Sequence, residues 1–118
     1  MTSVLFDSEL KLMDLIWENE PISAKELSLL SEKRIGWNKN TTYTILTKLV
    51  AKGVVRREDP GFLCRSLVSR SSVARAETRT LIDKVFGGSK KALFSALLED
   101  ETLSREELDE LRAMIEKR

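Results

Sequence analysis

The 118-residue sequence has no histidine, one cysteine, two prolines and five glycines. Histidine is the side chain used most often as a general base, a metal ligand or a pH switch, so its absence argues against most hydrolytic and metal-dependent sites. The single cysteine, Cys64, excludes an intramolecular disulfide and a thiolate zinc site, and it fits a reducing compartment. We therefore predict a protein that is not an enzyme, with no catalytic residues, no metal and no cofactor.

Long apolar runs are also missing. No stretch approaches the roughly 20 apolar residues that a membrane-spanning helix needs. The first residues do not combine a cationic segment with an apolar one, as a signal peptide would. Hydrophobic and charged fractions of 42% and 33% are typical of a folded soluble domain. The expectation is a cytoplasmic protein without membrane insertion.

The charged residues are distributed unevenly, although the net charge is only +1. From residue 99 onward acids dominate, whereas between residues 33 and 57 every charged residue is basic. The basic part of the chain is therefore expected to bind a polyanion. The basic block consists of Lys33, Arg34, Lys39, Lys48, Lys52, Arg56 and Arg57.

Two helices are predicted in the first part of the chain. Asp7 is expected to cap a first helix, which ends before Pro21 because proline cannot continue a helix. Ser23 and Glu26 are spaced as a capping box and predict the start of a second helix.

A third helix is predicted over Lys39–Lys52, with Asn38 as its N-cap. Ile45, Leu46 and Leu49 form one apolar stripe, so the opposite face is polar and exposed. Small polar side chains let a helix enter the major groove, where Asn reads adenine and Thr contacts thymine methyl groups. Lys39 and Lys48 are expected to contact phosphates. The residues expected to read bases are Asn40, Thr41, Tyr43, Thr44 and Thr47.

A β-hairpin is predicted next, because two segments of strand-like period flank the turn Asp59-Pro60-Gly61. Arg56, Arg57 and Arg65 on this hairpin are expected to contact DNA phosphates. Three helices followed by a basic hairpin is the order of a winged helix-turn-helix. The predicted fold is mainly α with a small β-hairpin, and residues 1–70 are assigned to a winged-helix DNA-binding domain.

Residues 71–118 are assigned to a helical dimerisation domain. Serines open its predicted helices: Ser71 or Ser72, then Ser89, then Ser104 in a capping box. Their apolar stripes need a partner, and a second copy of the chain is the simplest one. The expected dimer contacts are Leu93, Leu97, Leu108, Leu111 and Ile115.

Three residues that could carry chemistry are assigned to packing instead. Trp17 lies on the apolar stripe of the first helix, and Trp37 lies just before the third helix. Both are expected to pack rather than to stack on bases. Cys64, in a strand with apolar neighbours, is expected to be a buried, unreactive thiol.

Five segments together resemble the BlaI/MecI type of repressor, within the BlaI/MecI/CopY family of penicillinase and methicillin-resistance repressors. The resemblance implies a homodimer that binds dyad-symmetric operators and represses an antibiotic-resistance operon of the β-lactamase type. It also places the recognition positions on the polar face of the third helix described above. The segments are Glu9–Trp17, Trp37–Leu49, Lys52–Arg57, Phe86–Gly88 and Leu103–Leu111.

The resemblance further implies how repression is relieved. In the best-known members an activated membrane sensor-protease leads to cleavage between an Asn and a Phe in the dimerisation region. The corresponding residues here are Ser95 and Ala96, so that pair is not retained, and cleavage at a neighbouring bond or a different induction route stays open. The copper-responsive branch carries a C-terminal cysteine cluster that this sequence lacks, so copper sensing is not expected.

We interpret the chain as a dimeric repressor. Its two winged-helix domains block a promoter, and proteolysis separates them. One alternative is a winged-helix protein-interaction module without specific DNA binding. A small carboxylate-dependent hydrolase is a second, which the missing histidine and the lack of a glycine-rich phosphate loop disfavour. An RNA-binding winged helix is a third.

Overall fold

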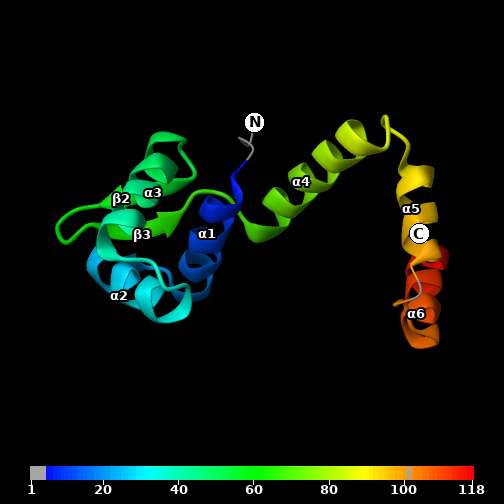
Figure 1. Cartoon of the computed structure of the whole chain (residues 1–118), viewed down its shortest axis with the longest axis horizontal. Helices are drawn as coiled ribbons and strands as arrows, with labels where there is room; N and C mark the ends of the chain where they lie inside the picture. The colour runs from blue at the N-terminus through cyan, green and yellow to red at the C-terminus, as the bar shows by residue number, and fades with distance from the viewer. Residues whose placement is uncertain (1–4, 101) are drawn as a thin grey trace. The chain divides into compact units, whose positions relative to one another are not determined.

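The computed structural model describes residues 5–100 and 102–118. The chain divides into two compact units, Met1–Glu77 and Thr78–Arg118. Helix α4 (Arg70–Val85) contributes residues to both units (Figure 1). No helix in the described part of the chain is both long and apolar enough to cross a membrane.

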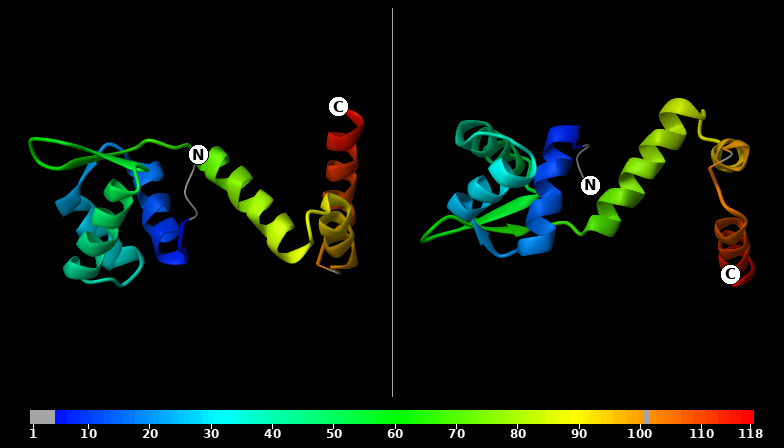
Figure 2. Two further views of the ribbon diagram at one scale, coloured as in Figure 1. Left: turned by 90° about the horizontal axis from the view of Figure 1, so that it is seen from above. Right: turned by 60° about the horizontal axis from the view of Figure 1, so that its bottom comes forward.

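In the part of the chain that the structure describes, the N-terminal unit combines three complete helices and the first half of α4 with a three-stranded antiparallel sheet of order β1-β3-β2. Its element order is that of a winged helix-turn-helix, which confirms the predicted fold. Strand β1 was not predicted, because two residues are too few to show the alternation of apolar and polar side chains that is typical of a strand. The hairpin of β2 and β3 extends beyond the helices in both views of Figure 2. The elements are α1 (Asp7–Asn19), β1 (Ile22–Ser23), α2 (Ala24–Arg34), α3 (Lys39–Ala51), β2 (Val55–Glu58) and β3 (Leu63–Ser66).

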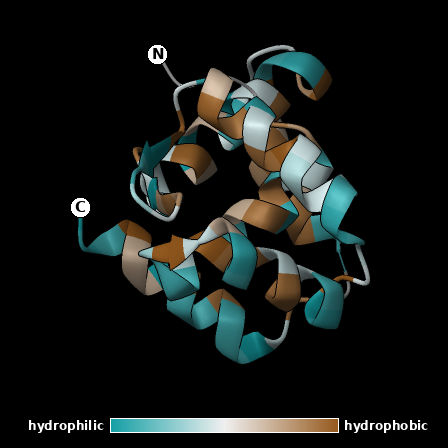
Figure 3. Cartoon of the chain, turned by 90° about the vertical axis from the view of Figure 1, so that its left-hand side faces the viewer, coloured by the Kyte–Doolittle hydropathy of each residue, from teal (hydrophilic) through white to brown (hydrophobic). Residues whose placement is uncertain are grey.

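The core of this unit lies between the helices and one face of the sheet. Apolar residues alternate with polar ones along the helices, as the brown and teal segments of Figure 3 show. The predicted stripe of α3 is buried, and the sheet adds Val55 and Cys64, which are at most 1% exposed. The largest side chains buried completely in the helices include Leu12, Met13, Ile16, Leu27, Leu46 and Leu49.

The starts of α2 and α3 confirm the predicted caps. The Ser23 hydroxyl oxygen accepts a hydrogen bond from the Glu26 amide at 3.1 Å. The Asn38 side-chain oxygen accepts one from the Thr41 amide at 2.8 Å. Each bond satisfies one of the amide groups that the first turn of a helix leaves free.

The predicted cap of α1 is wrong, because Asp7 is already helical and Phe6 occupies the N-cap position. The Glu9 carboxylate turns back and accepts the Phe6 amide at 2.8 Å, which replaces a side-chain cap. Glu9 is 1% exposed, and the same oxygen accepts from the Lys52 ammonium at 2.6 Å. This ion pair ties the start of α1 to the end of α3.

The C-terminal unit contains α5 (Lys90–Glu99) and α6 (Arg105–Glu116), and neither helix has a buried residue. The predicted caps Ser89 and Ser104 are confirmed, each accepting an amide hydrogen bond at 3.0 Å. The prediction that Ser71 or Ser72 opens the preceding helix is wrong. Helix α4 begins at Arg70, because the Ser69 hydroxyl oxygen accepts the Ser72 amide at 3.0 Å.

Candidate nucleic-acid interface

Helix α3 presents a polar face to solvent because its opposite side is fixed in the core. Ile45, Leu46 and Leu49 are at most 8% exposed, which leaves one orientation for the rest of the helix. The residues expected to read bases therefore share one side of α3. Asn40, Thr44 and Thr47 are exposed, whereas Thr41 and Tyr43 are half-buried.

The threonine hydroxyls on this face already donate hydrogen bonds within the helix. Thr44 donates to the Asn40 carbonyl at 2.9 Å, and Thr47 donates to the Tyr43 carbonyl at 2.8 Å. Such bonding to a carbonyl one turn earlier leaves the hydroxyl lone pairs and the methyl group available. In this conformation both threonines can accept from an adenine or cytosine amino group and can touch a thymine methyl. They cannot also donate to a guanine acceptor.

Thr42 has a different role. It is fully buried, and its hydroxyl donates to the Ser31 hydroxyl oxygen at 2.9 Å. This bond joins α3 to α2. Thr42 therefore helps to hold the two helices of the helix-turn-helix together and does not belong to the exposed face.

An aromatic contact connects α3 to the hairpin. The rings of Tyr43 and Phe62 meet edge to face, with centroids 6.4 Å apart and planes at 86°. The Arg57 guanidinium carbon lies 4.0 Å from the centroid of the Phe62 ring. On the other side, the Lys39 ammonium lies 5.8 Å from the Tyr43 centroid. The hairpin is thereby joined to the polar face of α3.

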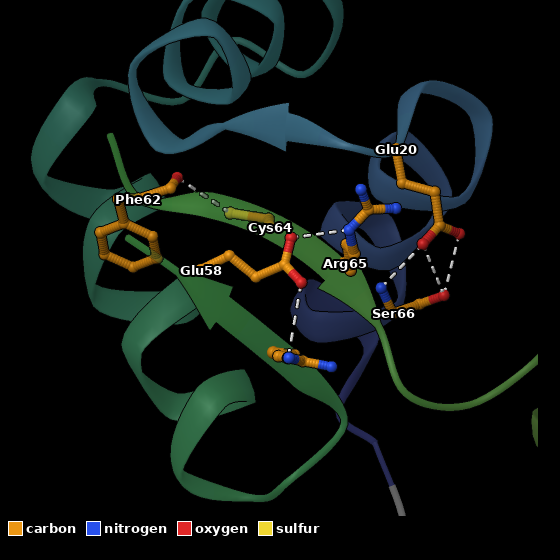
Figure 4. A network of polar contacts seen from close by, with 7 residues as sticks. Glu20, Glu58, Phe62, Cys64, Arg65 and Ser66 are labelled. Atoms are coloured by element: carbon orange, nitrogen blue, oxygen red, sulfur yellow. Dashed lines mark hydrogen bonds and ion pairs between the residues drawn. The ribbon is translucent and has the colours of Figure 1, made fainter. Parts of the chain in front are cut away.

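The three hairpin arginines are exposed but have acidic neighbours. Glu58 lies 2.7 Å from Arg65 and 3.5 Å from Arg56, and Asp59 lies 3.2 Å from Arg57 (Figure 4 shows the Glu58–Arg65 pair). The sequence did not indicate these pairs, because the block without acidic residues ends at Arg57. Exposed ion pairs contribute little stability and are screened by salt. Asp59 is 64% exposed whereas Glu58 is 28% exposed, so the Arg57 pair is the one that a phosphate replaces most readily.

Glu20 is a structural residue of this region that the sequence did not indicate. Its carboxylate accepts the Ser66 amide at 2.8 Å and the Ser66 hydroxyl at 2.8 and 3.0 Å (Figure 4). These bonds fasten the end of α1 to β3, the central strand of the sheet. The two residues are 46 positions apart, and no local pattern connects them.

The residues assigned to packing occupy buried or half-buried positions. Cys64 is 0% exposed, and burial raises the pKa of its thiol to about 11, which makes it a poor nucleophile at neutral pH. Trp17 is half-buried, and its indole nitrogen donates to the Val68 carbonyl at 3.0 Å. Trp37 packs against the core. Residues 5–100 and 102–118 contain no cluster of acidic or cysteine side chains that could hold a metal ion.

The residues expected to form a dimer contact lie on α5 and α6. Leu97, Leu108, Leu111 and Ile115 line one apolar groove of about 330 Å³ between these helices. Leu93 is half-buried and does not line it. The apolar surface of the unit is extensive. Its most exposed apolar side chains in α5 and α6 are Phe94, Leu98, Met114 and Ile115, at 50–66%.

The two residues at the expected cleavage position, Ser95 and Ala96, are both exposed and lie inside α5. Proteases bind their substrates as extended chains, so cleavage at this position requires α5 to unwind locally. In a single chain α5 has no buried residue, so packing does little to oppose such opening.

The family model and the similar proteins that match this chain indicate the same family. The family model described as penicillinase repressor matches residues 5–117. The methicillin resistance regulatory protein MecI of Staphylococcus aureus (strain N315) is 29% identical over 119 residues, covering 99% of this chain and 97% of its own. The penicillinase repressor of Bacillus licheniformis is 26% identical over 112 residues, covering 93% and 88%.

Two solved structures resemble part of the chain. The solution structure of the DNA-binding domain of the repressor BlaI has a TM-score of 0.54 at 27% identity, covering 60% of this chain and 92% of that one. The monomeric form of Bacillus licheniformis BlaI, in complex with the blaP half-operator, has a TM-score of 0.52 at 26% identity. It covers 60% of this chain and 89% of its own.

Proposed function

The chain belongs to the penicillinase repressor family, and from that premise we propose that it is a sequence-specific DNA-binding repressor. It acts as a homodimer on dyad-symmetric operators and controls an antibiotic-resistance operon of the β-lactamase type. Residues 1–70 bind DNA, and residues 71–118 form the dimer. The observation that carries the proposal is the exposed polar face of α3 beside a cationic hairpin.

Each part of this surface matches a part of duplex DNA. Asn40, Thr44 and Thr47 are exposed on a helix narrow enough to enter the major groove. Lys39 and Lys48 are exposed on the same helix, and the contact between Tyr43 and Phe62 joins the hairpin to it. Cations at the groove edges contact phosphates and position the helix, while the helix face reads bases. The threonine methyl groups favour contact with thymine, so we expect sites that contain A·T pairs.

The apolar surface of the C-terminal unit supports the dimer. An isolated pair of helices with no buried side chain gains little from folding, whereas a second copy would cover Leu97, Leu111 and Ile115. Two linked heads then engage two half-sites roughly one or two helical turns apart. Repression is steric, because the bound dimer occupies the promoter.

Loss of the dimer relieves repression in this proposal. Cleavage in α5, at Ser95–Ala96 or a neighbouring bond, separates the two heads, and the advantage of linked binding disappears. A membrane sensor-protease, or a protease that it activates, is the partner that supplies the cleavage. Mass spectrometry of the chain from cells exposed to a β-lactam tests this step, and an intact chain after full induction would exclude it.

The test of DNA binding is a fluorescence-anisotropy titration of the full chain at two salt concentrations. The probe is the duplex upstream of the chain's own gene, and a scrambled duplex of equal composition is the control. We expect tight binding to the upstream duplex with two chains per site, and a preference that persists at the higher salt concentration. Equal, salt-sensitive binding to both duplexes would instead favour a protein-interaction module.

A further inference from the structure

We propose that Phe62 is a positioning residue that holds the Arg57 guanidinium beside α3, and that Arg57 is the hairpin cation that contacts a phosphate next to the major groove. This inference rests on the proposed function, since it concerns how the same surface meets DNA. It gives Arg57 a different role from Arg56 and Arg65, although the sequence presents the three arginines as equivalent.

The register of the hairpin places the arginines on different faces of the sheet. Arg57 lies opposite Cys64, whereas Arg56 lies opposite Arg65. Successive side chains of a strand point to opposite faces. Arg57 therefore shares the face of Cys64, which is 0% exposed and packs in the core with the helices. Arg56 and Arg65 point away from the helices.

Phe62 contacts three elements around the proposed DNA-binding surface. Its ring lies 4.0 Å from the Arg57 guanidinium carbon and packs edge to face with Tyr43 of α3. Its carbonyl accepts the amide of Ala24, the first residue of α2, at 2.9 Å. One residue thus fixes the hairpin against both helices of the helix-turn-helix, and its ring face orients the guanidinium.

The backbone of Phe62 adopts an unusual conformation. Its φ is 48°, in the left-handed region, and it is the one non-glycine residue with positive φ in the described chain. A bulky side chain persists in this region only where surrounding contacts hold it, and such strain concentrates at functional positions. The contacts with Tyr43 and Arg57 supply that restraint.

The arginines on the two faces of the hairpin differ in how their charges are neutralised. Arg56 and Arg65 are like charges directly opposite each other, an arrangement that destabilises a sheet unless it is compensated. Glu58 supplies the compensation from 2.7 and 3.5 Å. The partner of Arg57 is Asp59, whose side chain is 64% exposed, so water screens this pair and a phosphate can replace it.

The first experiment measures the affinity of the full chain for the upstream and scrambled duplexes at several salt concentrations. Each phosphate contact adds about one unit to the slope of log affinity against log salt concentration. We expect Arg57→Gln to lower this slope by about one and to weaken binding roughly tenfold. Arg65→Gln, the matched control on the other face, should change the slope by less than half as much. Equal changes in the two variants would overturn the assignment of Arg57.

The second experiment tests the positioning role of Phe62. Phe62→Leu should weaken binding as much as Arg57→Gln, and the double variant should be no weaker than Arg57→Gln alone. Phe62→Tyr keeps the ring face and should bind like the unaltered chain. Losses that add in the double variant would refute the positioning role. If Phe62→Leu does not fold, Phe62→Met provides the same comparison without an aromatic ring.

The outcomes also separate this inference from the proposed function. Failure of the unaltered chain to bind either duplex would overturn both. Tight, specific binding by the unaltered chain together with unchanged binding by Arg57→Gln would overturn the inference and leave the proposed function standing.

Discussion

The N-terminal unit encloses its own core, whereas α5 and α6 of the C-terminal unit contain no buried residue. Both units have well-capped helices with apolar stripes, so the difference does not come from helix-forming tendency. In the N-terminal unit three helices and a sheet cover one another's apolar faces. In α5 and α6 the same kind of face stays open to solvent.

This difference shows which part of the chain can be stable alone. Burial of apolar surface is the main favourable contribution to folding, and short helices are marginal without it. The N-terminal unit satisfies that requirement within one chain. We expect the C-terminal unit to satisfy it in the dimer, so that only its stability depends on protein concentration. Both tryptophans lie in the N-terminal unit, so their fluorescence reports on that unit separately.

The largest expected effect comes from opening the N-terminal core. Leu46 is 0% exposed, and Leu46→Ala should lower the free energy of unfolding by about 2–5 kcal/mol through lost burial and the remaining cavity. Urea unfolding followed by tryptophan fluorescence measures this loss. Leu29→Ala, at a position 61% exposed on α2, is the control and should change stability by less than about 0.5 kcal/mol. Similar losses in both variants would contradict the assignment of the core.

The next largest effect concerns the open groove of the C-terminal unit. Leu111→Asp places a charge in that groove and should prevent dimer formation, which lowers operator affinity about 100-fold or more. Sedimentation equilibrium and anisotropy measure the two losses, while the tryptophan unfolding curve should stay unchanged. Ala113→Asp puts the same charge on α6 outside the groove and is the matched control. A dimer that survives Leu111→Asp would remove α6 from the interface.

Features that depend on local spacing were predictable from the sequence. Caps such as Ser23, Asn38 and Ser104 were identified correctly because the donor and acceptor lie three residues apart. The polar face of α3 followed from its apolar stripe, since burying Ile45 and Leu49 fixes the direction of every other side chain. Local spacing was sufficient for both kinds of feature.

Features that depend on tertiary contacts could not be predicted. The cap of α1 was assigned to Asp7, although Glu9 bonds to the Phe6 amide only three residues away; what the sequence did not indicate is that Glu9 is buried and pairs with Lys52, 43 residues away. Glu20 and Ser66 are similarly distant. The role of Glu58 depends on strand register, which decides that Arg56 and Arg65 share a face. The expected base and phosphate contacts stay predictions until DNA binding is measured.

A smaller effect is expected from pH. Burial raises the pKa of the Cys64 thiol from about 9 to about 11, so the folded state keeps a proton that the unfolded state loses. The resulting stability is complete below pH 9 and is lost as pH rises toward 11, by roughly 1 kcal/mol at pH 10. The difference in unfolding free energy between the unaltered chain and Cys64→Val isolates this contribution from other titrating groups. A difference that stays constant from pH 8 to roughly pH 10 would contradict the raised pKa.

Asp100 in the C-terminal unit provides the contrasting case. Hydrogen bonds from Thr102 lower the pKa of its carboxyl group, but the side chain is fully exposed. Its titration on acidification is therefore expected to leave the tryptophan unfolding curve unchanged, since that curve reports on the other unit.

The smallest effect compares equivalent caps in the two units. Asn38→Ala removes the cap of α3 and should lower the stability measured by tryptophan fluorescence by about 1 kcal/mol. Ser104→Ala removes the cap of α6 and should reduce helical circular dichroism while leaving the tryptophan curve in place. Asn38→Ser and Ser104→Thr keep the capping oxygens and are the matched controls. If Ser104→Ala also shifted the tryptophan curve, the two units would unfold together, and the C-terminal unit would draw its stability from the N-terminal one rather than from a second chain.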